Sequence, residues 1–450
     1  MNQPEAVAIS TAERLWSQDR AEALNYLAAL ISRESDPVPY LFAYANLLAR
    51  NRQHSDACKV YSQLLAMQPE HCESRVNYAV QLRLAGELAR AKEQMDRALR
   101  LDPSSARLWT NRANLCLEMD LLEEAEADHL KAISLNKEDP HVRWNYALFL
   151  LTMGRYNEGW KEYEWRHLIR GECPRASHLN ERTRLRLDSR RNILIQFEQG
   201  LGDAIQMLRY GIMMQSAGMD VSIEIPEPLR ALVDHINLRS VRLEDKPAPR
   251  ALEGQLRIPM MSLPLAFDTE LSNIPYAGGY IQVEGHPRRR VKNKPIVGVV
   301  WAGNKSHVND RNRSVTPDLL ITPLMSEQWE LVSLQAQLTA EESQSLTQKF
   351  PGLRYFGGQL PDFLATARLL AEVDLLVTVD TSIAHLAGSM AVPTILMVGW
   401  NGDWRWHRDV GPTAWYRSLH IIRRHQGEGI SNWLARGRIQ LESHLKETLL

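Results

Sequence analysis

Three short polar segments, each following an apolar run, carry residue types that could perform chemistry. The first follows NILIQF and ends in Asp203, the second follows IVGVVW and contains Lys305, and the third follows VDLLVTV and begins at Asp380. A carboxylate can take a proton as a general base, and cationic side chains can stabilise the charge that grows on a departing diphosphate. These residue types suit a transfer reaction with an anionic leaving group.

The first segment, Glu198-Gln199-Gly200-Leu201-Gly202-Asp203, runs into a predicted helix that contains AIQMLRYGIMM. Its two glycines would let the backbone approach a ligand closely, with Asp203 beside the ligand at the helix start. The third glycine of a dinucleotide fingerprint is missing, because Ile205 stands in its place. An ordinary N-cap is the alternative role for Asp203.

The second segment begins with Gly303 and Asn304 and places Lys305 and Arg311 after a predicted buried strand. Lysine and arginine at this point could stabilise a diphosphate in a cleft that excludes water. The alternative is an exposed polar loop.

The third segment, Asp380-Thr381-Ser382, leads into a predicted helix with His385 about one turn inside it. The free N–H groups of a helix start attract phosphate. They also need acceptors, so capping explains Thr381 or Ser382 equally well. His385 is either a donor to the same anion or a buried structural histidine.

These segments alternate with apolar runs that are typical of buried parallel strands. The runs are NILIQF, VSIEIP, LRIPMM, IVGVVWAG, WELVSLQ, VDLLVTVD and TILMVGW. The stretch HPRRRVKNK interrupts them, which predicts two Rossmann-like α/β halves at 192–286 and 292–450. A ligand would bind between the halves, at the carboxyl ends of strands.

Five of the twelve tryptophans lie close together near the C-terminus: Trp400, Trp404, Trp406, Trp415 and Trp433. They could stack on the base or sugar of a donor. The alternative is a packed interface, in which a final helix from about Asn432 braces the two halves.

Residues 1–165 carry an internal repeat with a period of 34. One alanine column contains Ala45, Ala79, Ala113 and Ala147, and a second contains Ala23, Ala57, Ala91 and Ala125, continued by Gly159. Small residues at a fixed period predict pairs of antiparallel helices that cross closely. The pattern resembles the tetratricopeptide repeat and predicts an α-solenoid.

Asn77, Asn111 and Asn145 form a polar column with the same period, on the first helix of each pair. In the tetratricopeptide-repeat family this asparagine commonly hydrogen-bonds the main chain of a bound peptide, which suits its donor and acceptor groups. The resemblance therefore implies an acceptor groove for a protein or peptide. The alternative is a scaffold residue without a ligand.

A basic segment at 166–191 separates the repeats from the α/β region. It contains eight arginines, which could bind anions or nucleic acid. No aromatic side chain for base stacking lies between Arg170 and Arg191. We therefore expect a solvated linker that packs on its neighbours.

The segments GLGD, WAGN with KSHVNDRNRS, SLQ and DTSIAHLAG together resemble the heptosyltransferase-related glycosyltransferases of the GT-B fold, in the subgroup with N-terminal tetratricopeptide repeats. By this resemblance Asp203 is the general base for the acceptor hydroxyl. Lys305 contacts the donor phosphates, and the remaining donor-binding positions are Gly202, Gly303, Asn304, Arg311, Gln335, Asp380, Thr381, Ser382 and His385. Gln335 stands where some relatives have an acidic residue.

The resemblance implies inverting transfer from a nucleotide-diphosphate-sugar, without a metal or another cofactor. Direct displacement needs a base and a positive field at the leaving group, which lysine, arginine and a helix terminus can supply. The chain has no Asp-x-Asp triplet to hold a divalent ion.

Composition excludes several other classes. The 450 residues include 53 lysines and arginines and 54 aspartates and glutamates, so we expect no general attraction to nucleic acid or an anionic membrane. The four cysteines form no Cys-x-x-Cys pair, and no apolar window reaches the length of a membrane span. We expect a cytoplasmic protein.

The sequence thus predicts a cytoplasmic glycosyltransferase whose repeats present a protein or other extended acceptor. Two alternatives stay open: a repeat scaffold whose transferase half has lost activity, and a nicotinamide-dependent oxidoreductase based on Gly200, Gly202 and Glu224. The sugar, nucleotide, acceptor and oligomeric state stay open as well.

Overall fold

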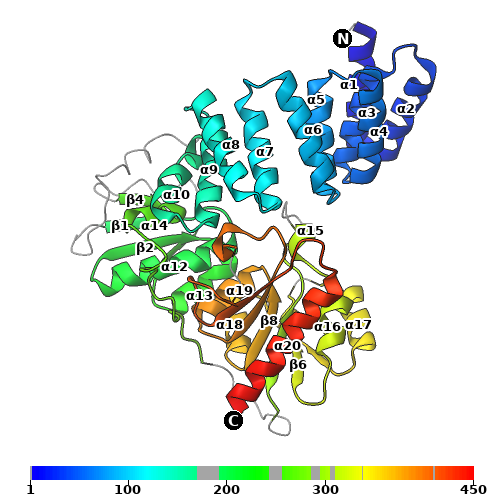
Figure 1. Cartoon of the computed structure of the whole chain (residues 1–450). Coiled ribbons are helices and arrows are strands. Elements are labelled where there is room, and N and C mark those ends of the chain that lie inside the picture. Colours follow the sequence, from blue (N-terminus) through cyan, green and yellow to red (C-terminus); the bar gives the residue numbers. More distant parts are fainter. Residues whose placement is uncertain are drawn as a thin grey trace. The chain divides into compact units, whose positions relative to one another are not determined.

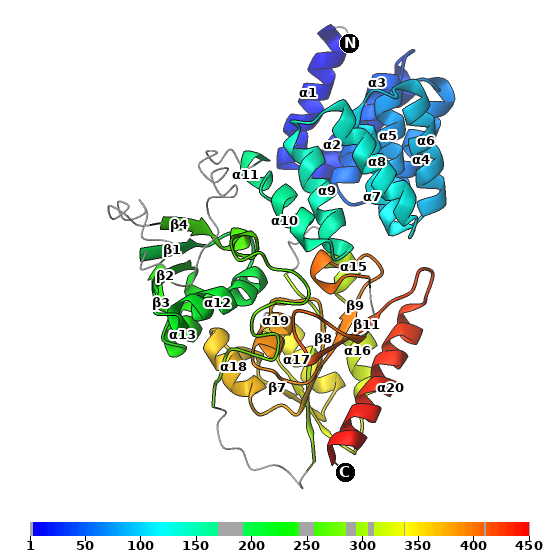
Figure 2. The same cartoon turned by 60° about the vertical axis from the view of Figure 1, so that its left-hand side comes forward.

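The computed structural model describes residues 3–169, 192–242, 256–284, 294–304, 310–336, 338–408 and 411–449. They form two compact units, Met1–Phe149 and Leu150–Leu450, and each is described by itself (Figures 1 and 2). Most of the predicted basic linker, residues 170–191, lies outside the described residues.

The first unit is an array of antiparallel helix pairs, coloured blue to cyan in Figure 1. Its helices are α1 (Gln3–Gln18), α2 (Arg20–Arg33), α3 (Val38–Arg50), α4 (His54–Met67), α5 (Cys72–Leu84), α6 (Leu88–Leu101), α7 (Ala106–Glu118), α8 (Leu122–Leu135) and α9 (Pro140–Thr152), the last of which continues into the second unit. Both predicted alanine columns are buried, as at Ala79 and Ala91, because only a small side chain fits where two helices cross closely. The predicted helical solenoid is confirmed.

The turn inside successive pairs repeats the same backbone conformation. Arg52, Gly86, Asp120 and Gly154 all have a left-handed φ, at 58°, 85°, 62° and 72°. Glycine adopts this conformation without strain, whereas arginine and aspartate do not. The 34-residue period therefore extends to the turns, even where the residue type does not reveal it.

The second unit contains two parallel sheets. The first has the order β3-β2-β1-β4, with β1 (Asn192–Gln196), β2 (Asp220–Ile225), β3 (Arg239–Arg242) and β4 (Leu256–Pro259). The second has the order β10-β11-β9-β8-β5-β6-β7, with β5 (Ile296–Val300), β6 (Glu330–Ser333), β7 (Leu353–Tyr355), β8 (Leu375–Val379), β9 (Thr394–Val398), β10 (Gly411–Pro412) and β11 (Leu419–Arg423). Only β10 pairs in the antiparallel sense among the described strands. The α/β prediction is confirmed, and each of the seven predicted runs contains a strand.

Helices flank both sheets. They are α10 (Tyr156–Tyr163), α11 (Arg166–Ile169), α12 (Leu201–Ser216), α13 (Glu227–His235), α14 (Leu263–Ala266), α15 (Asp310–Arg313), α16 (Pro317–Leu324), α17 (Ala340–Lys349), α18 (Phe363–Leu370), α19 (Ser382–Ser389) and α20 (Ile430–Leu449), with short 3-10 turns η2 (Met260–Ser262), η4 (Gly357–Gln359) and η5 (Trp404–Trp406). None of the described helices is long and apolar enough to cross a bilayer.

The final helix, α20, packs on β8, β9, β11 and α16 of the second half. Trp433 is buried in the core of that half, among residues such as Val377 and Met397. This packing differs from the predicted brace between the two halves, because the apolar face of α20 is covered by the second sheet.

Two other helices differ from the predicted domain division. α10 and α11 belong to the compact unit of the α/β region, although they lie within or next to the repeat range 1–165. Leu151 at the end of α9 approaches Gly159 of α10 so closely that a Cβ on Gly159 would lie 2.7 Å from its Cδ2. Gly159 thus continues the small-residue column, and α10 is the second helix of a last repeat pair.

Candidate functional site

The N-terminal ends of two helices, one from each α/β half, meet in the second unit. α12 begins after β1, and α19 begins after β8. A Cβ on Gly202 would lie 2.8 Å from Cδ2 of His385 and 3.5 Å from Cα of Ser382. The structure therefore brings the GLGD and DTSIAH segments together, and Gly202 serves this close helix approach.

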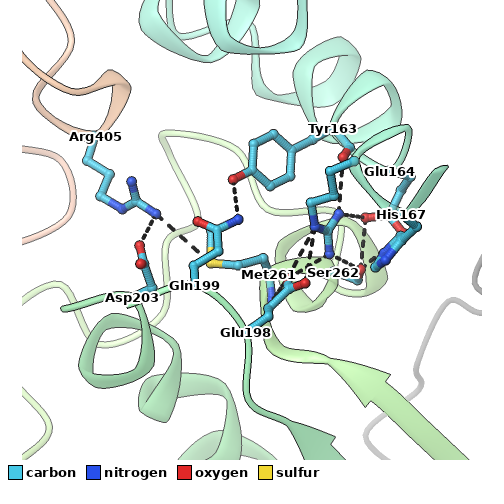
Figure 3. A network of polar contacts seen from close by, with 10 residues as sticks. Tyr163, Glu164, His167, Glu198, Gln199, Asp203, Met261, Ser262 and Arg405 are labelled. Atoms are coloured by element: carbon cyan, nitrogen blue, oxygen red, sulfur yellow. Dashed lines mark hydrogen bonds and ion pairs between the residues drawn. The ribbon is translucent and has the colours of Figure 1, made fainter. Parts of the chain in front are cut away.

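Asp203 lies in the first turn of α12, where it holds both the loop before the helix and a residue of the other half. Its Oδ2 accepts a hydrogen bond from the N–H of Gly200 at 2.7 Å, and its Oδ1 pairs with Nη2 of Arg405 (Figure 3). Burial raises the pKa of Asp203, while Arg405 and the Gly200 N–H oppose that rise. Asp203 is therefore more than an N-cap, since its second oxygen faces a cation.

Arg405 is the central cation of this site, and the sequence reasoning did not select it. Its side chain is 5% exposed, with Nη1 at 2.8 Å from Oδ1 of Asp403 and Nε at 2.7 Å from Oε1 of Gln206. Its guanidinium lies 4.2 Å from the ring centroid of Trp404. The tryptophan cluster indicated this segment, but no sequence spacing reveals the partners of Arg405.

Asp380 follows β8 and adds a third carboxylate to the group. Burial raises the pKa of Asp380 to about 6, and the charge of Asp403 adds to this effect, whereas Arg313 and Arg405 oppose it. Asp380 is thus harder to ionise than an ordinary aspartate.

His385 is buried and uncharged. Its Nδ1 lies 3.0 Å from the hydroxyl of Tyr416, and its ring stacks on Trp406 with centroids 5.1 Å apart. Burial holds the pKa of His385 well below its ordinary value, and Arg405 and Arg209 act in the same direction. The imidazole can therefore donate a hydrogen bond, but it does not supply a positive charge.

Two of the predicted donor-binding residues hydrogen-bond the backbone of the chain itself. Thr381 caps α19, with its hydroxyl oxygen accepting from the N–H of Ile383 at 3.2 Å. The amide of Gln335 bonds the peptide groups at the end of β5, accepting from Trp301 and Ala302 at 3.3 and 3.2 Å and donating to the Ala302 carbonyl at 3.1 Å. Gln335 thus fixes the loop that follows β5.

The remaining donor-binding predictions lie on that loop. Gly303 donates its N–H to the Ser314 hydroxyl at 3.1 Å, and a Cβ on Gly303 would lie 2.8 Å from Nη2 of Arg313. Asn304 is the last described residue before a gap at 305–309, so Lys305 lies outside the described residues, as does the side chain of Arg311.

A second buried network joins α10 and α11 to the end of β1 (Figure 3). Arg166, 2% exposed, bonds Glu198 at 2.8 Å, Glu164 at 2.6 Å and the Ser262 hydroxyl at 2.7 Å. Glu198 also accepts the N–H of Met261 at 3.0 Å. Arg166 was predicted in a solvated linker, and that prediction is wrong at this residue, because two carboxylates compensate its burial.

The three groove asparagines differ in their partners. Asn77 donates to Asn46 at 3.2 Å, and Asn145 accepts from Asn114 at 2.8 Å, so each bonds the residue 31 positions earlier in the preceding repeat. The residue 31 positions before Asn111 is Val80, whose side chain has no polar atom. Asn111 makes no side-chain hydrogen bond within the described part of the chain.

No group of three histidine, cysteine, aspartate or glutamate side chains among the described residues could hold a metal ion.

Comparison with known proteins identifies the repeat. Residues 106–139 match the tetratricopeptide repeat family model, which confirms the repeat prediction for that segment. Protein FlbA of Caulobacter vibrioides is 25% identical over 457 residues, covering 94% of this chain and 73% of the relative.

Solved repeat structures are also similar. MamA from Desulfovibrio magneticus RS-1 is 17% identical, with a TM-score of 0.32, over 38% of this chain and 96% of that chain. A thermophilic tetratricopeptide-repeat protein from Thermus thermophilus is 21% identical, with a TM-score of 0.32, over 39% and 94% of the two chains.

Proposed function

We propose that this chain is a GT-B-type glycosyltransferase that transfers a sugar, with inversion, from a nucleotide-diphosphate-sugar to an acceptor. One observation carries the proposal: half-buried Asp203 of the first α/β half pairs with buried Arg405 of the second, next to the converging starts of α12 and α19. Parallel α/β sheets bind ligands at the carboxyl ends of their strands, and both helices start there, after β1 and β8.

Asp203 acts as the general base for the acceptor hydroxyl. Burial raises the pKa of its carboxyl, which makes the carboxylate a stronger base. The Arg405 guanidinium opposes this rise and favours the ionised form. The pair thus balances basicity against the fraction of Asp203 that is deprotonated.

The second half holds the donor. Arg313 lies beside Gly303 at the end of β5. Its positive charge opposes the rise in the pKa of Asp380, which follows β8. A cation and the first N–H groups of α19 supply the positive field that a leaving diphosphate needs. The neutral His385 adds a hydrogen-bond donor rather than a charge.

The repeats hold the acceptor, which we propose to be a protein or peptide. YrrB, a tetratricopeptide-repeat protein described as having an unusual peptide-binding site, is 18% identical to this chain, with a TM-score of 0.27, over 34% of this chain and 77% of YrrB. In this chain Asn111 offers an amide for a peptide main chain, while Asn77 and Asn145 bond neighbouring repeats.

A repeat scaffold without transferase activity is the second candidate. The observation that favours it is that two predicted site residues already bond other groups of the protein. Asp203 pairs with Arg405, and Gln335 bonds the backbone.

Calorimetric titration with ADP, GDP, UDP and CMP, without added metal, tests the two candidates. We expect one nucleotide to bind the wild-type protein and to lose affinity in Asp380→Ala. The matched variant Asp203→Asn should keep nucleotide affinity within about twofold and lose transfer by about 100-fold or more, because the base faces the acceptor. Absence of binding to all four nucleotides would favour the scaffold.

A further inference from the structure

We propose that Tyr163, at the end of α10, is a positioning residue for Asp203. The inference rests on the proposed function for its catalytic meaning, but its geometry stands without that function. Tyr163 accepts a hydrogen bond from Nε2 of Gln199 at 2.7 Å (Figure 3). Gln199 lies directly before Gly200, whose N–H holds Asp203.

The backbone of Gln199 shows why this contact matters. Its φ is +66°, in the left-handed region that residues other than glycine rarely adopt. This conformation sends the chain from β1 into α12 and points the N–H of Gly200 at Asp203, 2.7 Å away. The Tyr163 hydroxyl stabilises the side chain of a residue whose backbone alone would favour another conformation.

Tyr163 is itself held in place. It is 2% exposed, its ring makes an edge contact with Trp160 at 5.9 Å between centroids, and the Arg166 guanidinium lies 4.9 Å from its centroid. Arg166 in turn bonds Glu198, the residue before Gln199. Glu198 and Gln199, consecutive residues of the loop before α12, are thus hydrogen-bonded by Arg166 and Tyr163, which are three positions apart.

The same helix also supports the cation that faces Asp203. The Trp404 ring makes edge contacts with the rings of Trp160 and Tyr163, at centroid distances of 5.2 and 6.5 Å. The Arg405 guanidinium lies 4.2 Å from the Trp404 ring centroid. α10, the second helix of the last repeat pair, therefore contacts the supports of both Asp203 and Arg405. α10 is in this way part of the candidate site.

Hydrogen exchange of the Gly200 amide in the 450-residue chain tests the inference without any substrate. Tyr163→Phe keeps the ring and removes the hydroxyl, so exchange should become about fivefold faster, as expected for the loss of one hydrogen bond. Tyr156→Phe is the matched control: Tyr156 lies in the same helix and its hydroxyl bonds Trp415 and His407, not Gln199. Exchange at Gly200 should stay unchanged in this control.

A rescue variant separates positioning from general stability. Glycine adopts a positive φ without strain, so Gln199→Gly in the Tyr163→Phe background should restore Gly200 exchange to within about twofold of wild type. Gln199→Ala in the same background should not. If Tyr163→Phe folds poorly, Gln199→Leu removes the same hydrogen bond from the other side and should give the same faster exchange.

Transfer kinetics supply the link to function. With the nucleotide-sugar that corresponds to the nucleotide found by calorimetry, Tyr163→Phe should lower kcat about fivefold and leave the donor KM unchanged. Unchanged Gly200 exchange in Tyr163→Phe, or a failed rescue by Gln199→Gly, overturns the inference. Altered and rescued exchange without any transfer activity would leave the positioning intact and remove the proposed function.

Discussion

Gly202 and His385 lie so close that a single added methyl group on Gly202 would come within 2.8 Å of the imidazole. The two residues come from different α/β halves, and both lie at the candidate site. Gly202 therefore sets how closely α12 can approach α19.

We predict that Gly202→Ala lowers the free energy of unfolding by about 1–3 kcal/mol, because the methyl group meets a buried ring and the backbone of Ser382. The matched control is Gly211→Ala in the same helix, where the nearest atoms lie at 3.4 and 3.5 Å in flexible side chains. That variant should be neutral or stabilised by up to about 1 kcal/mol through helix propensity. Urea unfolding of both variants checks the prediction, and equal effects would contradict it.

The charge of Arg405 should influence the position of the acidic limb in the pH profile of transfer. Because Arg405 opposes the rise in the pKa of Asp203, Arg405→Gln should raise that pKa further. The acidic limb of the profile of kcat/KM against pH should then move to higher pH by about one pH unit. Arg405→Lys keeps a positive charge and should move the limb less. A limb that stays in place in Arg405→Gln would show that Asp203 is not the titrating base.

Asn77 and Asn111 should separate stability from acceptor binding. Asn77→Ala removes a bond to Asn46 and should cost about 1 kcal/mol of unfolding free energy. Asn111→Ala removes no side-chain hydrogen bond of the described chain, so its stability should stay within about 0.5 kcal/mol of wild type while the acceptor KM rises. Thermal unfolding and acceptor kinetics measure the two effects. If Asn111→Ala leaves the acceptor KM unchanged, the groove is a scaffold.

His129 should make the repeat array sensitive to acid. It lies in the core near Tyr146 and Phe149, and neither ring nitrogen has a hydrogen-bond partner among the described residues. Burial lowers its pKa from 6.5 to about 4, so the unfolded chain binds a proton that the folded chain does not. Stability is complete above pH 6.5 and should fall by about 3 kcal/mol as the pH drops toward 4.

The variant His129→Phe should lose this part of the pH dependence. Urea unfolding of wild type and variant at matched pH values measures the difference, in which the contribution of other titrating groups cancels. His141, an exposed histidine on α9, is the control: His141→Gln should keep the wild-type dependence. A wild-type curve that runs parallel to that of His129→Phe would contradict the prediction.

Sequence alone predicted the parts of this molecule that depend on local patterns. The alanine columns follow from the 34-residue period, and the strands follow from apolar runs bounded by polar segments, so Ala79 and the run before Asp203 were assigned correctly. The sequence analysis also expected a ligand between the halves at the carboxyl ends of strands, and the structure brings GLGD and DTSIAH, which follow two such strands, close together.

The residues that sequence reasoning missed act through partners far away in the chain. Arg405 bonds Asp203 and Gln206, and Tyr163 bonds Gln199, at separations that no periodicity encodes. Position 52 is another feature that the residue type does not predict. Arg52 has the same left-handed φ as Gly86, but only a glycine indicates such a turn in the sequence. Residue type shows capacity for an interaction, whereas the partner depends on the tertiary fold.

The shared helix α10 limits how this chain could be recombined. Because α10 completes the last repeat and also contacts the loop before Asp203, a chimaera with a foreign repeat array would need to retain residues from about Leu150 to Ile169. The segment of α10 and α11 is thus inherited together with the α/β region.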